Sequence, residues 1–206
     1  MSRLNRLSLM GWISLLLLLF ALQPATAATE PNTIVKETTD KILAEVASLK
    51  QELDESPGRI YPLVEHIVLP RFDFVRMSRL VLGKHWRRAD EGEKRAFTYA
   101  FRELLIRTYT TALLNYSGQE INYLPMRAMA GASEVMVNTE VSSEGATPVP
   151  INYRLYLDGD EWKVYDLLID GVSLVSNYRT NFASEIRRRK LSGLISRLEA
   201  RNKKNK

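Results

Sequence analysis

The side chains that most often carry out chemistry in proteins are scarce in this sequence. None of the 206 residues is a cysteine, which excludes a disulfide framework, a cysteine zinc site and a cysteine nucleophile. The two histidines, His66 and His85, lie far apart and fit no metal-binding or catalytic spacing. A G-x-S-x-G turn and a Gly-rich phosphate loop are also missing. The sequence therefore predicts neither a catalytic centre nor a metal site.

An acidic run and a single aspartate are the remaining candidates for a metal site or a catalytic group. The run Asp158-Gly159-Asp160-Glu161 lacks the other ligands of a calcium loop, and it is fully explained as a hairpin turn. Asp166 stands in an otherwise apolar strand and would need a partner such as Arg154 or Arg179. Because no second titratable group is evident, ion pairing or capping is favoured over acid–base catalysis.

The first residues indicate export from the cytoplasm. Arg3 and Arg6 precede an apolar stretch from Leu7 to Leu22, and the small residues Ala25-Thr26-Ala27 follow. This order is typical of a secretory signal peptide, and the apolar run is shorter than the roughly 20 residues of a membrane span. We expect residues 1–27 to be a signal peptide cleaved near Ala27, leaving residues 28–206 as a single exported domain.

Positive charge is concentrated at the C-terminal end. The formal net charge is +5, and nine basic residues accompany the single acid Glu199 between Arg187 and Lys206. Apolar residues recur among them at helical spacing, so this tail is predicted to be a basic helix with a frayed end from Asn202 to Lys206. A solvated helix end is favoured, with contact to a membrane or a partner as the alternative. Export argues against nucleic acid as a partner.

The hydrophobic pattern changes its period along the chain. Helical spacing predicts helices over 33–54 and 59–69, another that Asp73 caps, and a long one that starts at a capping box of Asp90 and Glu93. Between residues 121 and 169 the period becomes two, which predicts about four antiparallel strands. The expected fold class is α+β, with helices of the first half and a C-terminal helix covering the sheet.

Three segments of the sequence resemble one protein family. Asp73-Phe74 and Leu82-Gly83-Lys84-His85-Trp86 are similar to the D-F … L-G-x-x-W segment of the MlaC family, also called toluene-tolerance auxiliary substrate-binding proteins. The helix from Phe97 to Tyr116 resembles the family's F-x-x-x-F-x-x-L-L-x-x-T-Y stretch. The segment from Trp162 to Phe182 is similar to its most specific block, W-x-V-Y-D … G-V-S-L-V-x-N-Y-R-x-x-F.

The resemblance implies a periplasmic phospholipid carrier that has no enzymatic activity and no cofactor. Such proteins enclose a deep apolar cavity between helices and a sheet. They shuttle phospholipid between an outer-membrane lipoprotein–porin complex and an inner-membrane ABC transporter with an MCE-type subunit, which maintains the lipid asymmetry of the outer membrane. Exposing each methylene to water costs about 0.8 kcal/mol, so acyl chains crossing an aqueous compartment need such an apolar slot.

We place this slot between one face of the sheet and one face of the long helix, with further apolar residues closing its ends. The assignment rests on strand alternation and helical spacing, which identify inward faces. The lipid-binding residues that we expect are Phe74, Met77, Leu105, Tyr109, Leu113, Val135, Val137, Ile151, Tyr153, Leu155 and Val172.

Two other functions remain open at this point. An exported envelope enzyme, such as a lipid hydrolase, would need a titratable pair in a pocket. The simplest candidate pair is Asp166 with His66 or His85. A structural envelope adaptor would instead present an exposed apolar patch.

Overall fold

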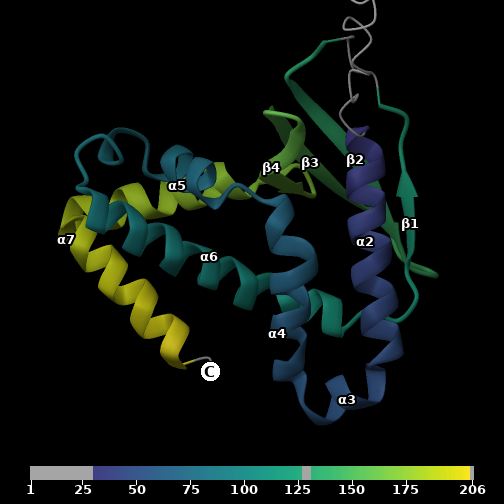
Figure 1. The fold of residues 1–206 in the computed structure, drawn as a ribbon. Coiled ribbons are helices and arrows are strands. Elements are labelled where there is room, and N and C mark those ends of the chain that lie inside the picture. Colours follow the sequence, from purple (N-terminus) through teal and green to yellow (C-terminus); the bar gives the residue numbers. More distant parts are fainter. Residues whose placement is uncertain (1–29, 127–130, 205–206) are drawn as a thin grey trace, which may run out of the picture.

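The computed structural model describes residues 30–126 and 131–204, in which helices from both halves of the chain lie against an antiparallel sheet (Figure 1). Helices come first, strands second and a helix last, so the predicted α+β class is confirmed. The signal peptide expected over residues 1–27 lies outside the described residues and stays a prediction. Within the described ranges, no helix is both long and apolar enough to span a membrane.

The first helical region is more broken than its periodicity suggests. The stretch expected as one helix over 33–54 forms two helices that are separated at Leu49, and the stretch expected over 59–69 passes through α-helical, π-helical and 3₁₀ turns. The helical stretch ends close to Pro70, because proline has no N–H to donate to a helix. The segments are α2 (Pro31–Ser48), α3 (Lys50–Glu55), η1 (Pro57–Arg59), α4 (Ile60–Leu63), the π-helical η2 (Val64–Val68) and η3 (Leu69–Arg71).

The two predicted capping sites are confirmed. Asp73 begins α5 (Phe74–Leu82) by accepting a hydrogen bond of 2.8 Å from the backbone N–H of Arg76. Asp90 begins the long α6 (Glu91–Leu114), and its carboxylate accepts from the backbone N–H of Glu93, whose own carboxylate accepts from the backbone N–H of Asp90. The short helix η4 (Gly83–His85) lies between α5 and α6.

The sheet is a meander in which each strand pairs antiparallel with the next. The described residues form five strands where about four are expected, because the fifth has only two residues and is too short to show an alternating pattern. The strands are β1 (Glu120–Tyr123), β2 (Glu134–Ser142), β3 (Val149–Asp158), β4 (Glu161–Ile169) and β5 (Val172–Ser173).

The hairpin between β3 and β4 lies where the sequence predicts it, with a shift of one residue. Asp158 pairs with Glu161, so Gly159 and Asp160 form the two-residue turn. Gly159 has a φ of +61°, which suits the first central position of a type II′ turn, where glycine is favoured.

Helix α7 (Leu174–Lys204) bends sharply at Lys190, which has φ 62° and ψ 175°. This backbone region is accessible almost only to glycine and costs about 1–3 kcal/mol for other residues. The bend lets the second half of α7 pack along α6, where Leu194 and Leu198 are buried and the Asn202 side chain donates to the carbonyl of Ala100 at 2.9 Å. The predicted frayed end is therefore wrong at Asn202, because packing against α6 holds it.

Asp166 joins the sheet to α7. Its carboxylate accepts hydrogen bonds from the Ser173 hydroxyl at 2.6 Å and from the Val175 backbone N–H at 3.1 Å, and it lies 3.6 Å from the Arg154 guanidinium. Asp166 is buried, with only 2% of the residue's surface exposed. The expected role in ion pairing or capping is confirmed, and Arg154 is the cation.

We expect capping to contribute more than the ion pair at this site. Asp166→Ala leaves the buried Val175 N–H without an acceptor and should lower the free energy of unfolding by about 2–4 kcal/mol. Arg154→Ala removes a cation that is 45% exposed and 3.6 Å from a carboxylate that keeps its two hydrogen bonds, so it should cost less than about 1 kcal/mol. Urea unfolding of both variants measures the difference, and equal losses would contradict the capping role.

The bend at Lys190 predicts that substitutions at residues 190 and 193 change the free energy of unfolding in opposite directions. Lys190→Gly should raise the free energy of unfolding by about 1 kcal/mol, because glycine adopts this backbone freely, whereas Lys190→Ala should bring no such gain. Gly193→Ala should destabilise, because a Cβ there would lie 2.8 Å from the Cβ of Arg189. Thermal unfolding tests all three variants, and a glycine variant no more stable than the alanine variant would show that the bend is not strained.

Candidate functional site

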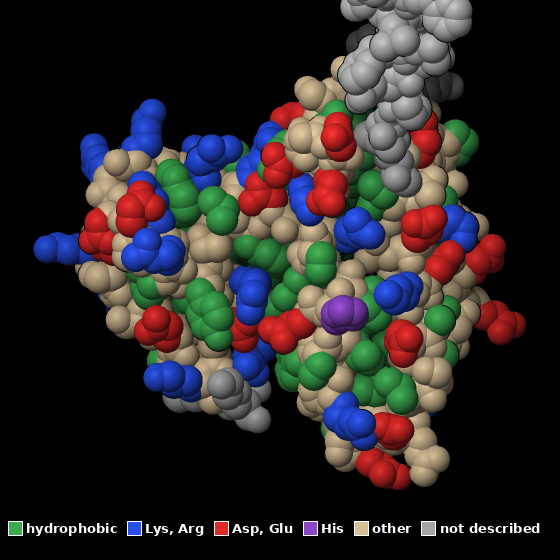
Figure 2. All heavy atoms as spheres, in the orientation of Figure 1, with side chains coloured by type: hydrophobic (Ala, Val, Ile, Leu, Met, Phe, Trp, Pro, Cys, Tyr) green, Lys and Arg blue, Asp and Glu red, His purple; other side chains and the backbone are tan. Residues whose placement is uncertain are grey.

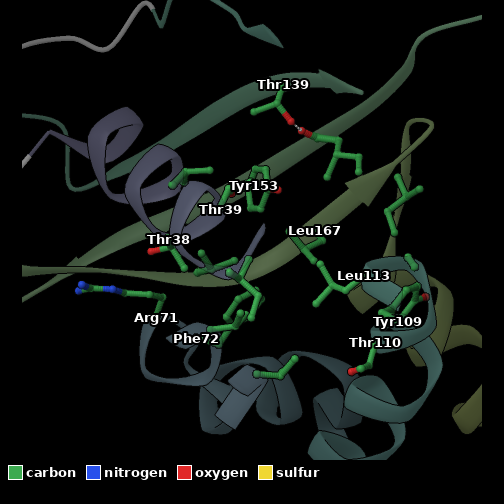
Figure 3. Close-up of a pocket in the computed structure, with 18 of the residues that line it drawn as sticks. Thr38, Thr39, Arg71, Phe72, Tyr109, Thr110, Leu113, Thr139, Tyr153 and Leu167 are labelled. Carbon is green, nitrogen blue, oxygen red and sulfur yellow. Dashed lines mark hydrogen bonds between the residues drawn. The ribbon is translucent and has the colours of Figure 1, made fainter. Parts of the chain in front are cut away.

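A cavity of about 640 Å³ lies between the sheet and the helices that cover it (Figure 3). Helix α2, the turns η2 and η3, the start of α5 and the second half of α6 form one side, and strands β1 to β4 form the other. This volume is within the range of about 300–1,000 Å³ that small-molecule sites occupy.

The walls of the cavity are predominantly apolar, for a reason visible in the sequence. Leu105, Tyr109 and Leu113 follow one another at helical spacing on α6, so they share one face of that helix. Alternate residues of a strand likewise share one face of the sheet, and Ile151 and Tyr153 on β3 point inward together. Further apolar lining comes from Ile34, Val35, Ile42, Val64, Phe72, Ile106, Ile121, Val141, Leu167 and Ile169.

The structure brings most of the expected site residues together at this cavity. The residues that line it are Phe74, Met77, Leu105, Tyr109, Leu113, Ile151 and Tyr153. They come from α5, α6 and β3, which are distant in sequence. Contact of these side chains with lipid stays a prediction.

The other four expected residues do not line the cavity. Val137 and Leu155 are fully buried in a packed cluster, with Val135 against it. Val172 is 53% exposed on the short edge strand β5. The placement of these four on the cavity wall is therefore corrected.

The physical reason is that one face of the sheet serves two purposes. At one end of the β2–β3 pair, Trp162 and Val164 from β4 and the first turns of α2 pack directly on Val137 and Leu155. At the other end, where Thr139 pairs with Ile151, the sheet faces the cavity. The alternation of apolar residues along a strand identifies which side chains point inward. It does not indicate which of them pack against other side chains and which line a cavity.

Helix α2 supplies cavity residues that the sequence analysis did not assign. Ile34, Val35 and Ile42 lie on its buried side and line the cavity. The apolar spacing over 33–54 was a signal for an inward face of this helix, but it gave no indication that the face meets the same cavity as α6.

The hydroxyl groups inside the cavity are uncharged. Burial raises the pKa of Tyr153 to about 12, and its hydroxyl is hydrogen-bonded with Thr39 and Thr139. Burial also raises the pKa of Tyr109 to about 12, next to Tyr178. These groups therefore stay neutral at ordinary pH and add polarity without charge to an apolar wall.

Charged groups are nearly missing from the cavity wall. Arg71 is the one ionisable residue other than tyrosine among the described lining residues, and it is exposed, with its side chain extending away from the apolar cluster (Figure 3). Asp166 is held by Ser173 and Val175 and is not part of the wall. Among the residues that the structure describes, no group of three His, Cys, Asp or Glu could hold a metal ion.

Comparison with known proteins decides the family. Residues 36–200 match the sequence model of the MlaC protein family. The chain belongs to the MlaC family. The resemblance found in the sequence is thereby confirmed, and with it the prediction of a binding protein rather than an enzyme.

Two curated relatives of this MlaC-family chain are bacterial proteins. The toluene tolerance protein ttg2D of Pseudomonas putida is 28% identical over 176 residues, which cover 84% of this chain and 81% of that protein. The intermembrane phospholipid transport system binding protein MlaC of Haemophilus influenzae is 22% identical over 202 residues, which cover 95% of this chain and 94% of that protein.

A solved structure has the same fold. The phospholipid-binding protein from Ralstonia solanacearum, determined in complex with a phospholipid, superimposes with a TM-score of 0.80 at 32% sequence identity. The match covers 86% of this chain and 99% of that chain. The arrangement of sheet and helices around the cavity is therefore shared with a protein whose structure contains a phospholipid.

The buried tyrosine gives a testable dependence of stability on pH. The pKa of Tyr153 is about 12 in the folded protein and about 10 in an unfolded chain. The unfolded state therefore loses its proton first, so the stability contribution is complete below about pH 10 and declines as the pH rises toward 12. Tyr153→Phe should flatten this alkaline decline in urea unfolding between about pH 9 and 11, and an unchanged slope would contradict the burial of this hydroxyl.

Proposed function

We propose that this protein is a periplasmic carrier that binds a phospholipid with its acyl chains inside the cavity. The observation that carries the proposal is the apolar cavity of about 640 Å³ in a fold shared with a phospholipid complex at 32% identity. Each methylene moved from water into such a wall gains about 0.8 kcal/mol. Two acyl chains bring many methylenes, so burying them explains both the size and the composition of the cavity.

The phospholipid headgroup stays outside the apolar wall in this proposal. Burying a phosphate without a partner would cost far more than the gain from a few methylenes. Arg71 lies at the edge of the cavity with an exposed guanidinium, and arginine binds phosphate through two parallel hydrogen bonds. We therefore propose Arg71 as a headgroup contact and the seven predicted lining residues as acyl-chain contacts.

Transport requires partners on both sides of the aqueous compartment. We propose that the carrier exchanges phospholipid with an outer-membrane lipoprotein–porin complex and with the MCE-type subunit of an inner-membrane ABC transporter, which maintains the lipid asymmetry of the outer membrane. Family membership and the relative named as part of an intermembrane phospholipid transport system support this assignment. A carrier without an energy source can only follow the differences in affinity that its partners offer. The direction of phospholipid transport therefore comes from the partners.

The two other functions considered for the sequence receive less support. An envelope hydrolase needs a titratable pair in its pocket, and the described cavity wall contains no Asp, Glu or His. A structural adaptor would place its apolar residues in an exposed patch, whereas here apolar residues of both halves of the chain line a shared cavity.

Filling the cavity tests the proposal. Ile151→Trp and Leu113→Trp add a ring to two facing walls, and each should lower the phospholipid that co-purifies with the protein by at least about tenfold, because an indole displaces several methylenes worth about 0.8 kcal/mol each. Native mass spectrometry measures the occupancy. Thermal unfolding of delipidated protein should show variants at least as stable as the wild type, because the ring occupies existing space.

Tyr99→Trp is the matched control for these variants. It lies on α6, is 60% exposed and does not line the cavity, so its lipid content should equal that of the wild type. Wild-type protein that purifies without lipid, or cavity variants that keep full occupancy, would refute the proposed function.

A further inference from the structure

One end of the molecule carries an unusual concentration of positive charge. It lies where the chain connects α5 to α6 and where α7 bends (Figure 1), and Lys and Arg side chains gather at the same end in Figure 2. We call this surface the basic tip and define it by seven exposed residues, Lys84, Arg87, Arg88, Arg187, Arg188, Arg189 and Lys190.

The two segments that form the basic tip are close in space. Burial and three neighbouring cations lower the pKa of His85, and these cations are Lys84, Arg88 and Arg187. Beneath them, Leu82 from α5 packs in one buried cluster with Leu191 from α7. Residues about a hundred positions apart in the chain therefore create a shared positive field at one surface.

No ion pair within the described part of the chain neutralises this charge. None of the seven cations makes an ion pair there. The nearby carboxylates are already engaged, since Asp90 and Glu93 form the capping box, Glu91 pairs with Lys94, and Glu185 pairs with Arg197. Unneutralised like charges repel one another and destabilise the folded state, so the tip is complementary to an anionic partner.

The backbone at Lys190 points to the same conclusion. This lysine occupies a conformation that glycine adopts without strain, so the chain carries a positive side chain at the bend at a conformational cost. The strained bend also directs Arg187, Arg188 and Arg189 to the outer corner of α7, where all three are exposed.

The physical character of the tip favours a membrane surface over a protein. Specific protein interfaces are centred on buried aromatic and apolar anchors, but the apolar residues under the tip, such as Leu82, Ile186 and Leu191, are already buried in the core. What remains is a convex corner of long, flexible cations. Such a surface suits the spread negative charge of anionic headgroups, to which each Lys or Arg near the surface adds binding energy.

We propose that the basic tip docks this protein on anionic phospholipid membranes by charge alone, without inserting apolar side chains. The tip lies beside the start of α6 at Glu91, and Tyr109 in the cavity is 18 residues further along that helix, a distance of about 27 Å at 1.5 Å per residue. Docking therefore leaves the cavity wall uncovered. The inference does not depend on what the cavity binds.

Sedimentation with vesicles tests the proposal on the full mature chain. Wild-type protein should bind vesicles that contain phosphatidylglycerol and ignore vesicles of pure phosphatidylcholine. Binding should fall steeply as salt is raised above about 0.1 M, where the screening length is about 10 Å. The tip variant carries the substitutions Arg87→Gln, Arg88→Gln, Arg187→Gln and Arg188→Gln. Its affinity for the anionic vesicles should be lower than that of the wild type by at least about tenfold.

A control variant removes the same four charges from other exposed positions and should lose less than about threefold. Its substitutions are Lys41→Gln, Lys50→Gln, Arg59→Gln and Lys203→Gln. Equal losses in the two variants would show that only net charge matters and would overturn the tip as the site. Absence of vesicle binding in the wild type would overturn the membrane proposal, even if the tip then bound an acidic protein.

Two further readouts separate docking from folding and from cargo. Nuclear magnetic resonance titration of His85 should show a higher pKa in the tip variant than in the wild type, because two of its neighbouring cations are gone; an unchanged pKa would contradict the shared field. Native mass spectrometry should show equal lipid content in the tip variant and the wild type. A loss of lipid in the tip variant would contradict the independence of docking and cargo, whereas a wild type without lipid that still bound vesicles would refute the proposed function alone.

Discussion

The interior of this protein is shaped by the need to keep an apolar space open in water. Side chains that line a cavity gain free energy by collapsing onto one another, and a sealed, dry void costs about 24 cal/mol per Å³. The cavity of about 640 Å³ is partly open, so it costs less per Å³ than a sealed void, but its apolar wall still loses free energy wherever it meets water. The space is therefore sustained by a stiff frame around it and by whatever occupies it.

The frame consists of polar ties between the sheet and the helices. The Tyr156 hydroxyl donates to Asp73 at 2.5 Å at the start of α5, and the Arg76 guanidinium lies 3.8 Å from the centre of the Tyr156 ring. Asp166 connects β4 to the start of α7 through Ser173 and Val175. These contacts join α5 and α7 to the strands outside the cavity wall, so the wall itself can remain predominantly apolar, with Arg71 as its one charged residue among those described.

Much of this arrangement could be predicted from local signals. The capping box at Asp90, the cap at Asp73 and the alternation over β2 to β4 each depend on neighbouring residues in the chain. The structure confirms the helix starts and the strands that these three signals predict. Val137 and Leu155 were misplaced because their surroundings depend on how α2 and Trp162 cross the sheet, which no local pattern reveals. The bend at Lys190 was missed for a similar reason, since packing of α7 against α6 imposes a backbone that the lysine itself disfavours.

We propose that the space between the sheet and α6 holds the acyl chains of a phospholipid. A crystal structure of the protein purified from cells without added lipid tests it most directly. We expect continuous density for acyl chains in contact with Leu105, Tyr109 and Ile151, with the headgroup outside the apolar wall near Arg71. A cavity closed by repacked side chains, or one that contains only ordered water, would contradict it.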